Sequence, residues 1–208
     1  IPVLRGAAEE EDDPEVRGHL YFAMGNAATR KGFLGMAAYA FERSARTGGR
    51  WSREAAERLF RSEKIIAERP RIVGLVPLSG KLSDIGFAVL AGAEVALGTL
   101  HGRERNGATP VIRWVDTAGQ AETARREFVA AAADRMVLGI LGPVTGEEGR
   151  SVGVAFTQNS PPTLYLGQKQ IFEKPFLYGF GLSPAQEARA LFGYLARTGV
   201  SDLLLFHP

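Results

Sequence analysis

The stretch from Gly74 to Leu82, GLVPLSGKL, superficially suggests a phosphate-binding loop. A P-loop needs four residues between its two glycines and a Ser or Thr directly after the lysine, because the backbone N–H groups hold phosphates and the hydroxyl binds magnesium. Here five residues separate Gly74 from Gly80, and Leu82 follows Lys81. The stretch therefore does not predict nucleotide binding, and it lacks the Gly-x-Gly-x-x-Gly turn of dinucleotide-binding folds.

The side chains that most often catalyse reactions or bind metals are scattered along the chain. His19, His101 and His207 show no metal-ligand spacing, and there is no cysteine to supply a thiolate or a disulfide. Asp116 ends an apolar run, but an Asp-Thr pair at a strand end usually holds the following turn and caps the next helix. We predict no catalytic residue, no metal site and no cofactor, and a protein that is not an enzyme.

The composition narrows the range of partners. The chain has 208 residues and a formal net charge of +2, so bulk electrostatics favour neither a nucleic-acid partner nor a membrane surface. No apolar run approaches the length of a membrane span. The first residues, IPVLRGAAEEEDDPE, lack the order of a signal peptide, so export would require a signal that is not in this chain.

The pattern of the chain changes at Arg69 and Pro70. Residues 1–69 contain only helical patterns, whereas residues 70–208 alternate apolar runs of strand length with helical stretches, as in a parallel α/β sheet. We expect a helical segment over 1–69 and an α/β domain over 70–208. The expected helices of the first segment are Glu15 to Thr29, Phe33 to Arg46 and Ser52 to Glu68.

The helical segment carries the spacing of one tetratricopeptide repeat. In that pattern small residues such as Gly25 and Ala37 let two helices approach, while Tyr21 and Phe41 fill the space between them. An ordinary helical hairpin remains the alternative. Because a single repeat cannot bury its own apolar face, we expect either a longer array or helices docked on the α/β part. The pattern residues are Tyr21, Met24, Gly25, Ala28, Gly32, Ala37, Phe41 and Ser44.

The α/β part opens with a strand, a turn and a long helix. Ile72 to Val76 is a nearly continuous apolar run, as expected of a parallel strand covered on both faces. Ser79 and Gly80 then turn the chain over the carboxyl end of that strand. Open α/β sheets bind their ligands at this edge.

This segment, with Gly86 and a helix containing Gly92, Ala93 and Glu94, resembles the opening of the Leu/Ile/Val-binding family of periplasmic receptors of type I fold. Later segments resemble further parts of that fold in order. They are Val111 to Asp116, Val137 to Gly142, Thr163 to Leu166 and Phe176 to Ser183. The resemblance implies that residues 70–208 form the first lobe of a parallel-sheet α/β fold, with the second lobe absent from this chain.

The resemblance also implies where a ligand would bind. In the family, the loop after the third strand and the N–H groups that open its helix hold a ligand carboxylate, and the loop after the fourth strand meets the amino group. Glu147 and Glu148 leave an alternative open, in which the helix end is satisfied by its own acids and capped by a threonine. The expected ligand-binding residues are Ser79, Ile85, Val144, Thr145, Gly146, Gly167 and Gln168.

A second family shares features of the C-terminal part. Leu182, Ser183 and Pro184, followed by Glu187-Ala188-Arg189, resemble the substrate-binding-like domain of the penicillin-binding-protein activator lipoproteins. Those proteins also place a tetratricopeptide-like region before a type I fold, and they contact a peptidoglycan synthase.

Two functions are therefore expected, both periplasmic and with lipid anchoring possible. The first is a receptor that passes amino acids or similar small solutes to the membrane subunits of an ABC transporter. The alternative is an activator-like protein that regulates a peptidoglycan synthase by contact. Since this chain supplies half of an interlobe cleft, we expect it to bind small molecules poorly by itself.

Overall fold

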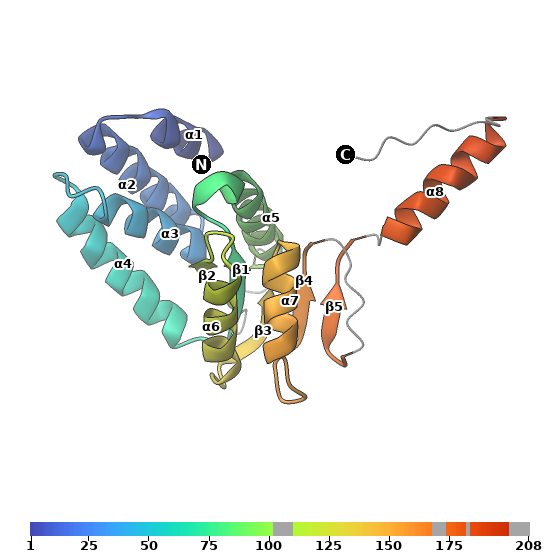
Figure 1. The fold of residues 1–208 in the computed structure, drawn as a ribbon. Helices are drawn as coiled ribbons and strands as arrows, with labels where there is room; N and C mark the ends of the chain where they lie inside the picture. Colours follow the sequence, from blue (N-terminus) through green and yellow to red (C-terminus); the bar gives the residue numbers. More distant parts are fainter. Residues whose placement is uncertain (102–109, 168–173, 182–183, 200–208) are drawn as a thin grey trace.

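The computed structural model describes residues 1–101, 110–167, 174–181 and 184–199. Four helices come first, and five strands alternate with further helices after them (Figure 1). The elements are α1 (Pro2–Glu10), α2 (Pro14–Arg30), α3 (Leu34–Ala45), α4 (Ser52–Ala67), β1 (Arg71–Val76), a 3₁₀ turn (Gly80–Leu82), α5 (Ser83–His101), β2 (Val111–Asp116), α6 (Ala121–Ala132), β3 (Val137–Leu141), α7 (Gly146–Ala155), β4 (Thr163–Tyr165), β5 (Leu177–Gly179) and α8 (Pro184–Arg197).

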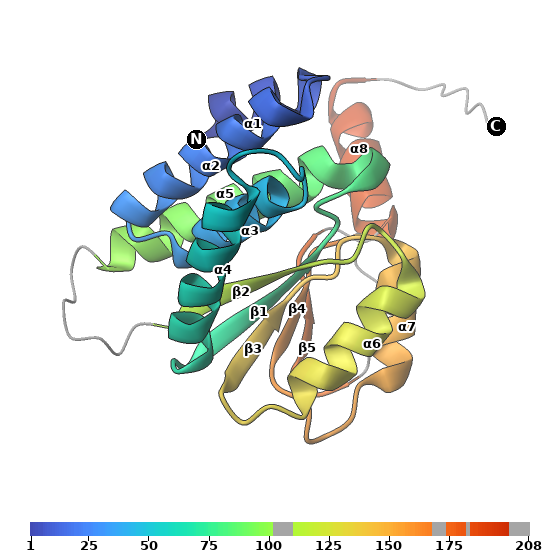
Figure 2. The ribbon, with the colours of Figure 1, turned by 90° about the vertical axis from the view of Figure 1, so that its left-hand side faces the viewer.

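The strands form one parallel sheet in the order β2-β1-β3-β4-β5. Helices α6 and α7 cover one face, and α5 with the N-terminal helices covers part of the other (Figure 2). An apolar core lies on each face of the sheet, and side chains of β1 contribute to both. Val73 and Leu75 pack toward α6 and α7, whereas Val76 packs toward the helical segment. The α/β prediction is confirmed, and β1 to β4 lie within about a residue of their predicted positions, whereas β5 was not predicted as a strand.

Helix α1 was not among the predicted helices: Ile1, Leu4 and Ala8 lie on one face and pack on the core, but the segment is short and contains Gly6. Its position is held by Arg5, which is buried. The guanidinium forms ion pairs with Glu9, at 2.7 Å, and with Asp84 on α5, at 3.0 Å. It also lies 4.5 Å from the centre of the Phe87 ring. Contacts with a helix about 80 residues away, rather than local propensity, thus stabilise α1 where it lies.

The pair α2 and α3 packs as the tetratricopeptide pattern predicts at one key point. A Cβ on Gly25 would overlap the Phe41 ring, so a glycine is needed for this close approach. Tyr21 and Phe41 are both buried in the shared core. Whether the hairpin belongs to the tetratricopeptide class stays a prediction.

The helical segment docks on the sheet through a buried carboxylate. Glu94 Oε1 on α5 accepts hydrogen bonds of 3.0 Å from the Met36 backbone N–H and from Trp114 Nε1. The first bond satisfies an N–H in the opening turn of α3, which has no side-chain cap of its own. One apolar core then runs from the first four helices to α5 and the end of β1. The expected docking of the helices on the α/β part is therefore present.

The pKa of Glu94 is raised, because burial penalises the charged carboxylate more than the bonds from Trp114 and Met36 favour it. The folded state therefore binds this proton more tightly than the unfolded state. The contribution of Glu94 to stability is largest below the unfolded pKa of about 4.3 and falls as pH rises through the folded pKa.

We therefore expect the stability of Glu94→Gln, which keeps the oxygen acceptor, to improve relative to the wild type as pH rises from 4 to about 8. Urea unfolding at a series of pH values measures this difference. The exposed Glu10→Gln is the control and should show no such trend. A constant difference between Glu94→Gln and the wild type would refute the prediction.

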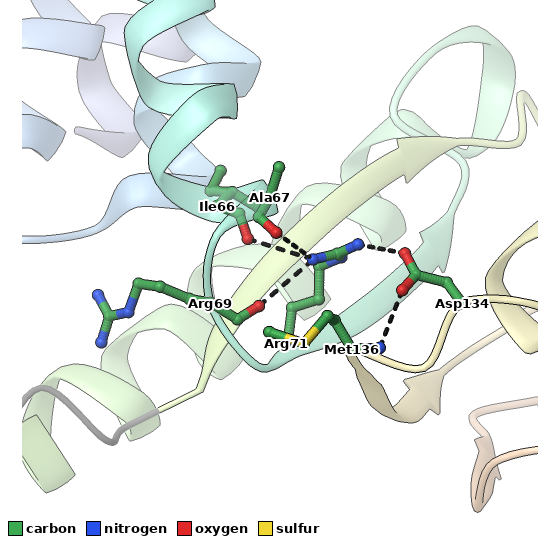
Figure 3. A network of polar contacts seen from close by, with 6 residues as sticks. All are labelled: Ile66, Ala67, Arg69, Arg71, Asp134 and Met136. Atoms are coloured by element: carbon green, nitrogen blue, oxygen red, sulfur yellow. Dashed lines mark hydrogen bonds and ion pairs between the residues drawn. The ribbon is translucent and has the colours of Figure 1, made fainter.

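The end of α4 is joined to the sheet by Arg71, as Figure 3 shows. Its buried guanidinium donates hydrogen bonds to the Ile66, Ala67 and Arg69 carbonyl oxygens, at 3.5, 2.9 and 3.3 Å, and pairs with Asp134. A helix C-terminus leaves carbonyls without intrahelical partners, and a cation there is favourable. One side chain at the start of β1 thus connects α4 to the turn before β3.

Helix α8 lies apart from the sheet (Figure 1). Its Leu191, Phe192 and Tyr194 side chains are each about half exposed. Among the described residues, no helix has the length and apolar character needed to cross a bilayer.

Candidate functional site

The loops after β1, β3 and β4 meet at the carboxyl edge of the sheet. The Gly142 N–H donates to the Leu164 carbonyl, at 2.8 Å, and the Leu166 N–H donates to the Pro143 carbonyl, at 3.0 Å. These bonds hold the loops after β3 and β4 side by side. Because β1 and β3 are parallel neighbours, the loop after β1 leaves the sheet at the same edge.

Asp116 shapes the loop after β1. Its Oδ1 accepts from the N–H groups of Leu78 (2.8 Å), Ser79 (3.2 Å) and Ala118 (2.8 Å). The expectation that Asp116 holds the following turn is confirmed, but the Asp-Thr pair does not cap α6, whose N-cap is Gln120 and has no side-chain cap bond. The additional bonds to the loop after β1 were not predicted. They fix the position of Ser79, a predicted ligand residue.

Two glycines allow the loops to approach one another. Gly142 has a φ of +102°, and a Cβ there would overlap the Leu75 carbonyl. A Cβ on Gly167 would overlap both the Val144 carbonyl and the Tyr165 hydroxyl. Side chains other than hydrogen cannot fit at either position without moving backbone. The chain thus brings Val144 and Gly167 into contact.

The remaining predicted residues differ in accessibility. The Ile85 side chain, in the first turn of α5, is 49% exposed, and Gly146 is also exposed. Ser79, Val144, Thr145 and Gly167 are partly buried. A Cβ on Gly86 would overlap the Pro77 carbonyl, so α5 begins pressed against the loop. Gln168 lies outside the described residues, as do Leu182 and Ser183 of the second resemblance.

The amino end of α7 is closed by a capping box between Thr145 and Glu148. Glu148 Oε2 accepts from the Thr145 N–H, at 3.0 Å, and from the Thr145 hydroxyl, at 2.8 Å, while the Glu148 N–H donates to Thr145 Oγ1, at 3.3 Å. Glu148 is fully buried, whereas Glu147 is exposed. The carboxylate of the chain itself therefore occupies the Thr145 amide and hydroxyl that were expected to hold a ligand.

Glu147 and Glu148 were both expected at the start of this helix, without a distinction between them. The Thr-x-x-Glu spacing of a capping box could have singled out Glu148, because it places that side chain back over the helix start. Glu148 also acts on its neighbour Tyr165. Burial raises the pKa of the Tyr165 hydroxyl, and the negative charge of Glu148 raises it further.

Nothing in the described part of the chain resembles a metal centre, since no three His, Asp or Glu side chains there gather closely enough to hold an ion. His19 stacks on the Trp51 ring, with ring centres 5.0 Å apart. The chemistry that the edge offers is hydrogen bonding by backbone groups and apolar contact by Ile85.

The fold is that of known periplasmic binding proteins of type I. An ABC transporter substrate-binding protein from Sphaerobacter thermophilus is 25% identical with a TM-score of 0.53, over 62% of this chain and 36% of its own. The branched-chain amino acid transporter substrate-binding protein LivJ from Streptococcus pneumoniae, solved with isoleucine, is 16% identical with a TM-score of 0.50, over 55% of this chain and 34% of its own.

Full-length LpoA from Haemophilus influenzae is 19% identical with a TM-score of 0.47, over 95% of this chain and 37% of its own. The chain thus spans little more than a third of the length of these solved chains. No model of a protein family and no curated protein matches the sequence.

Proposed function

We propose that this chain is the first lobe of a non-enzymatic periplasmic receptor that binds an amino acid or a similar small polar solute for an ABC transporter. The observation that carries the proposal is the meeting of the loops after β1, β3 and β4 at one sheet edge, in a lobe whose fold is similar to that of substrate-binding proteins. Ligands of open α/β sheets bind at this edge. The division into residues 1–69 and 70–208 belongs to the same proposal.

The ligand contacts in this proposal come from two kinds of group. Ile85 offers an exposed apolar side chain beside the first loop. Ser79, Gly146 and the backbone of Val144 and Gly167 offer polar groups. Because Thr145 is bonded to Glu148, its part is to shape the loop rather than to hold a ligand carboxylate. The second lobe would close over these groups in the complete protein.

Isothermal titration calorimetry of the complete protein with the natural amino acids tests this proposal. We expect Ile85→Asp to weaken binding about tenfold or more, because it replaces apolar contact by a charge. The control is Val154→Asp, on α7, where the native side chain is 83% exposed. Absence of heat with every amino acid would refute the amino-acid proposal, and equal losses in both variants would refute the site.

A second candidate is regulation of a peptidoglycan synthase by protein contact. The specific observation that favours it is the buried capping box, because Glu148 already occupies the Thr145 groups that a ligand carboxylate would need. Regulation by protein–protein contact does not require a small ligand at the edge of the sheet. If calorimetry shows no heat with small solutes, surface plasmon resonance with a purified synthase decides this candidate. No binding there would reject it.

A further inference from the structure

The loop between β1 and α5, residues 77–86, has its two ends in contact. A Cβ on Gly86 would overlap the Pro77 carbonyl, so the first turn of α5 lies against the start of the loop. Ser79 lies near the first end, and Ile85 comes just before the second. Both belong to the proposed ligand contacts. Their positions therefore depend on what holds each end of this loop.

The first end of the loop is held by the sheet. Asp116, at the end of β2, accepts from the N–H groups of Leu78 and Ser79, at 2.8 and 3.2 Å. The Leu78 side chain is buried in the apolar core that the sheet shares with the helical segment. Ser79 is thus fixed from β2.

The second end of the loop is held by the helical segment, since α1 lies next to the start of α5 (Figure 1). Arg5 Nη1 donates to Asp84 Oδ1, at 3.0 Å, one residue before Ile85. The same guanidinium lies 4.5 Å from the centre of the Phe87 ring, two residues after Ile85. The Phe87 ring in turn packs against Tyr39 of α3, with ring centres 6.3 Å apart. Ile85 therefore lies between two residues that the helical segment contacts.

Arg5 has two acidic partners, which play different parts. Glu9 lies 2.7 Å from the guanidinium but belongs to α1 itself, so this ion pair connects nothing outside the helix. The pair with Asp84 joins α1 to α5. The Arg5 side chain is 9% exposed, whereas that of Asp84 is 87% exposed, so the strength of this pair is moderate. Removing one partner at a time can therefore separate the two parts.

We propose that α1 is a positioning element of the solute site, in which Arg5 holds Asp84 and Phe87 and thereby sets the position of Ile85. This inference rests on the proposed function, and it adds that the helical segment controls the affinity of the site. If only a fraction of the molecules hold the loop in place, the apparent affinity falls by that fraction. By reciprocity, a bound solute stabilises the contact between α1 and α5.

Hydrogen–deuterium exchange of the complete protein without solute tests the positioning. We expect Arg5→Met, which keeps a long apolar side chain but removes the charge, to exchange faster than the wild type in residues 77–90. Glu9→Gln is the matched control, because it removes the ion pair within α1 and leaves the contact with α5. Its exchange in the same residues should equal that of the wild type. Unchanged exchange in Arg5→Met would overturn the inference.

Isothermal titration calorimetry of the complete protein with each natural amino acid tests the effect on the site. For the amino acid that binds the wild type, we expect Arg5→Met to weaken binding about three- to tenfold. The variant loses an ion pair with an exposed acid and a contact with an aromatic ring. Arg5→Lys keeps the charge and should recover part of the affinity.

Two further variants distinguish positioning from a general loss of stability. The Cβ of Gly25→Ala would overlap Phe41 inside the helical segment, so this variant should lower the urea midpoint but keep the affinity for the solute. In an Asp84→Asn background, Arg5→Met should weaken binding less than it does in the wild type, because one partner through which it acts is already altered.

The outcomes separate this inference from the proposed function. If no amino acid binds the wild type, the proposed function fails and the inference fails with it. If the wild type binds and Arg5→Met binds equally tightly, the inference alone is overturned. The same holds if Gly25→Ala weakens binding as much as Arg5→Met, or if Arg5→Met causes equal losses with and without Asp84→Asn.

Discussion

Arg71→Ala is expected to lower the free energy of unfolding by about 2 to 4 kcal/mol. Arg71 is 8% exposed, and its guanidinium donates to the carbonyls of Ile66, Ala67 and Arg69 while pairing with Asp134. Alanine removes this donor from all three carbonyls, of which that of Ile66 still accepts from the Arg69 N–H, at 3.3 Å. It also removes the connection between that helix and the turn before β3. Equilibrium unfolding in urea measures the loss.

Two variants test whether the hydrogen bonds of Arg71, rather than its charge alone, stabilise the folded protein. Arg71→Lys keeps the charge but cannot reach several acceptors in a fixed geometry, so it should recover only part of the stability. Arg135→Ala removes an exposed arginine and should change the free energy of unfolding by less than about 0.5 kcal/mol. Equal stability of Arg71→Ala and Arg135→Ala would contradict the role given to Arg71.

Glu148→Ala is expected to cost about 2 to 3 kcal/mol, because it removes the capping box of α7 and leaves a void at a fully buried side chain. Glu148→Gln retains the acceptor of the box and should cost less. Thermal or urea unfolding distinguishes the two. Formate should restore part of the stability of Glu148→Ala and leave the wild type unchanged, because only the variant has a vacant anion position at the helix start.

The matched control for this series is Glu147→Ala. Glu147 lies in the same first turn of α7 but is exposed and takes no part in the capping box. Its loss should change stability by no more than about 0.5 kcal/mol, as for most surface positions. If Glu147→Ala cost as much as Glu148→Ala, the helix dipole rather than the buried carboxylate would explain the effect.

The strands could be predicted from the sequence because burial on both faces requires apolar runs. Val73 and Leu75 pack toward one helical layer and Val76 toward the other, so every second residue must be apolar on each side. The resemblance supplied the order of these strands and their loops. The meeting of Val144 with Gly167 follows from that order, since parallel strands end at one edge.

Other features depend on contacts between residues distant in sequence, which local patterns do not encode. Arg5 contacts Asp84 and Phe87 on α5, and these distant residues determine where α1 lies. In the sequence, Arg71 is an ordinary charged residue at the start of a strand. Its role depends on Asp134 and the end of α4, which lie beside it only in the folded chain. The burial of Glu148 beside exposed Glu147 is likewise decided by tertiary packing.

The central claim is that the complete protein binds a small solute at the carboxyl edge of this sheet, and hydrogen–deuterium exchange tests it most directly. Exchange would be followed by mass spectrometry with and without a saturating mixture of amino acids. We predict slower exchange in residues 77–86 and 142–149 when solute is present, with α4 unchanged. Unchanged exchange in both segments would contradict the claim.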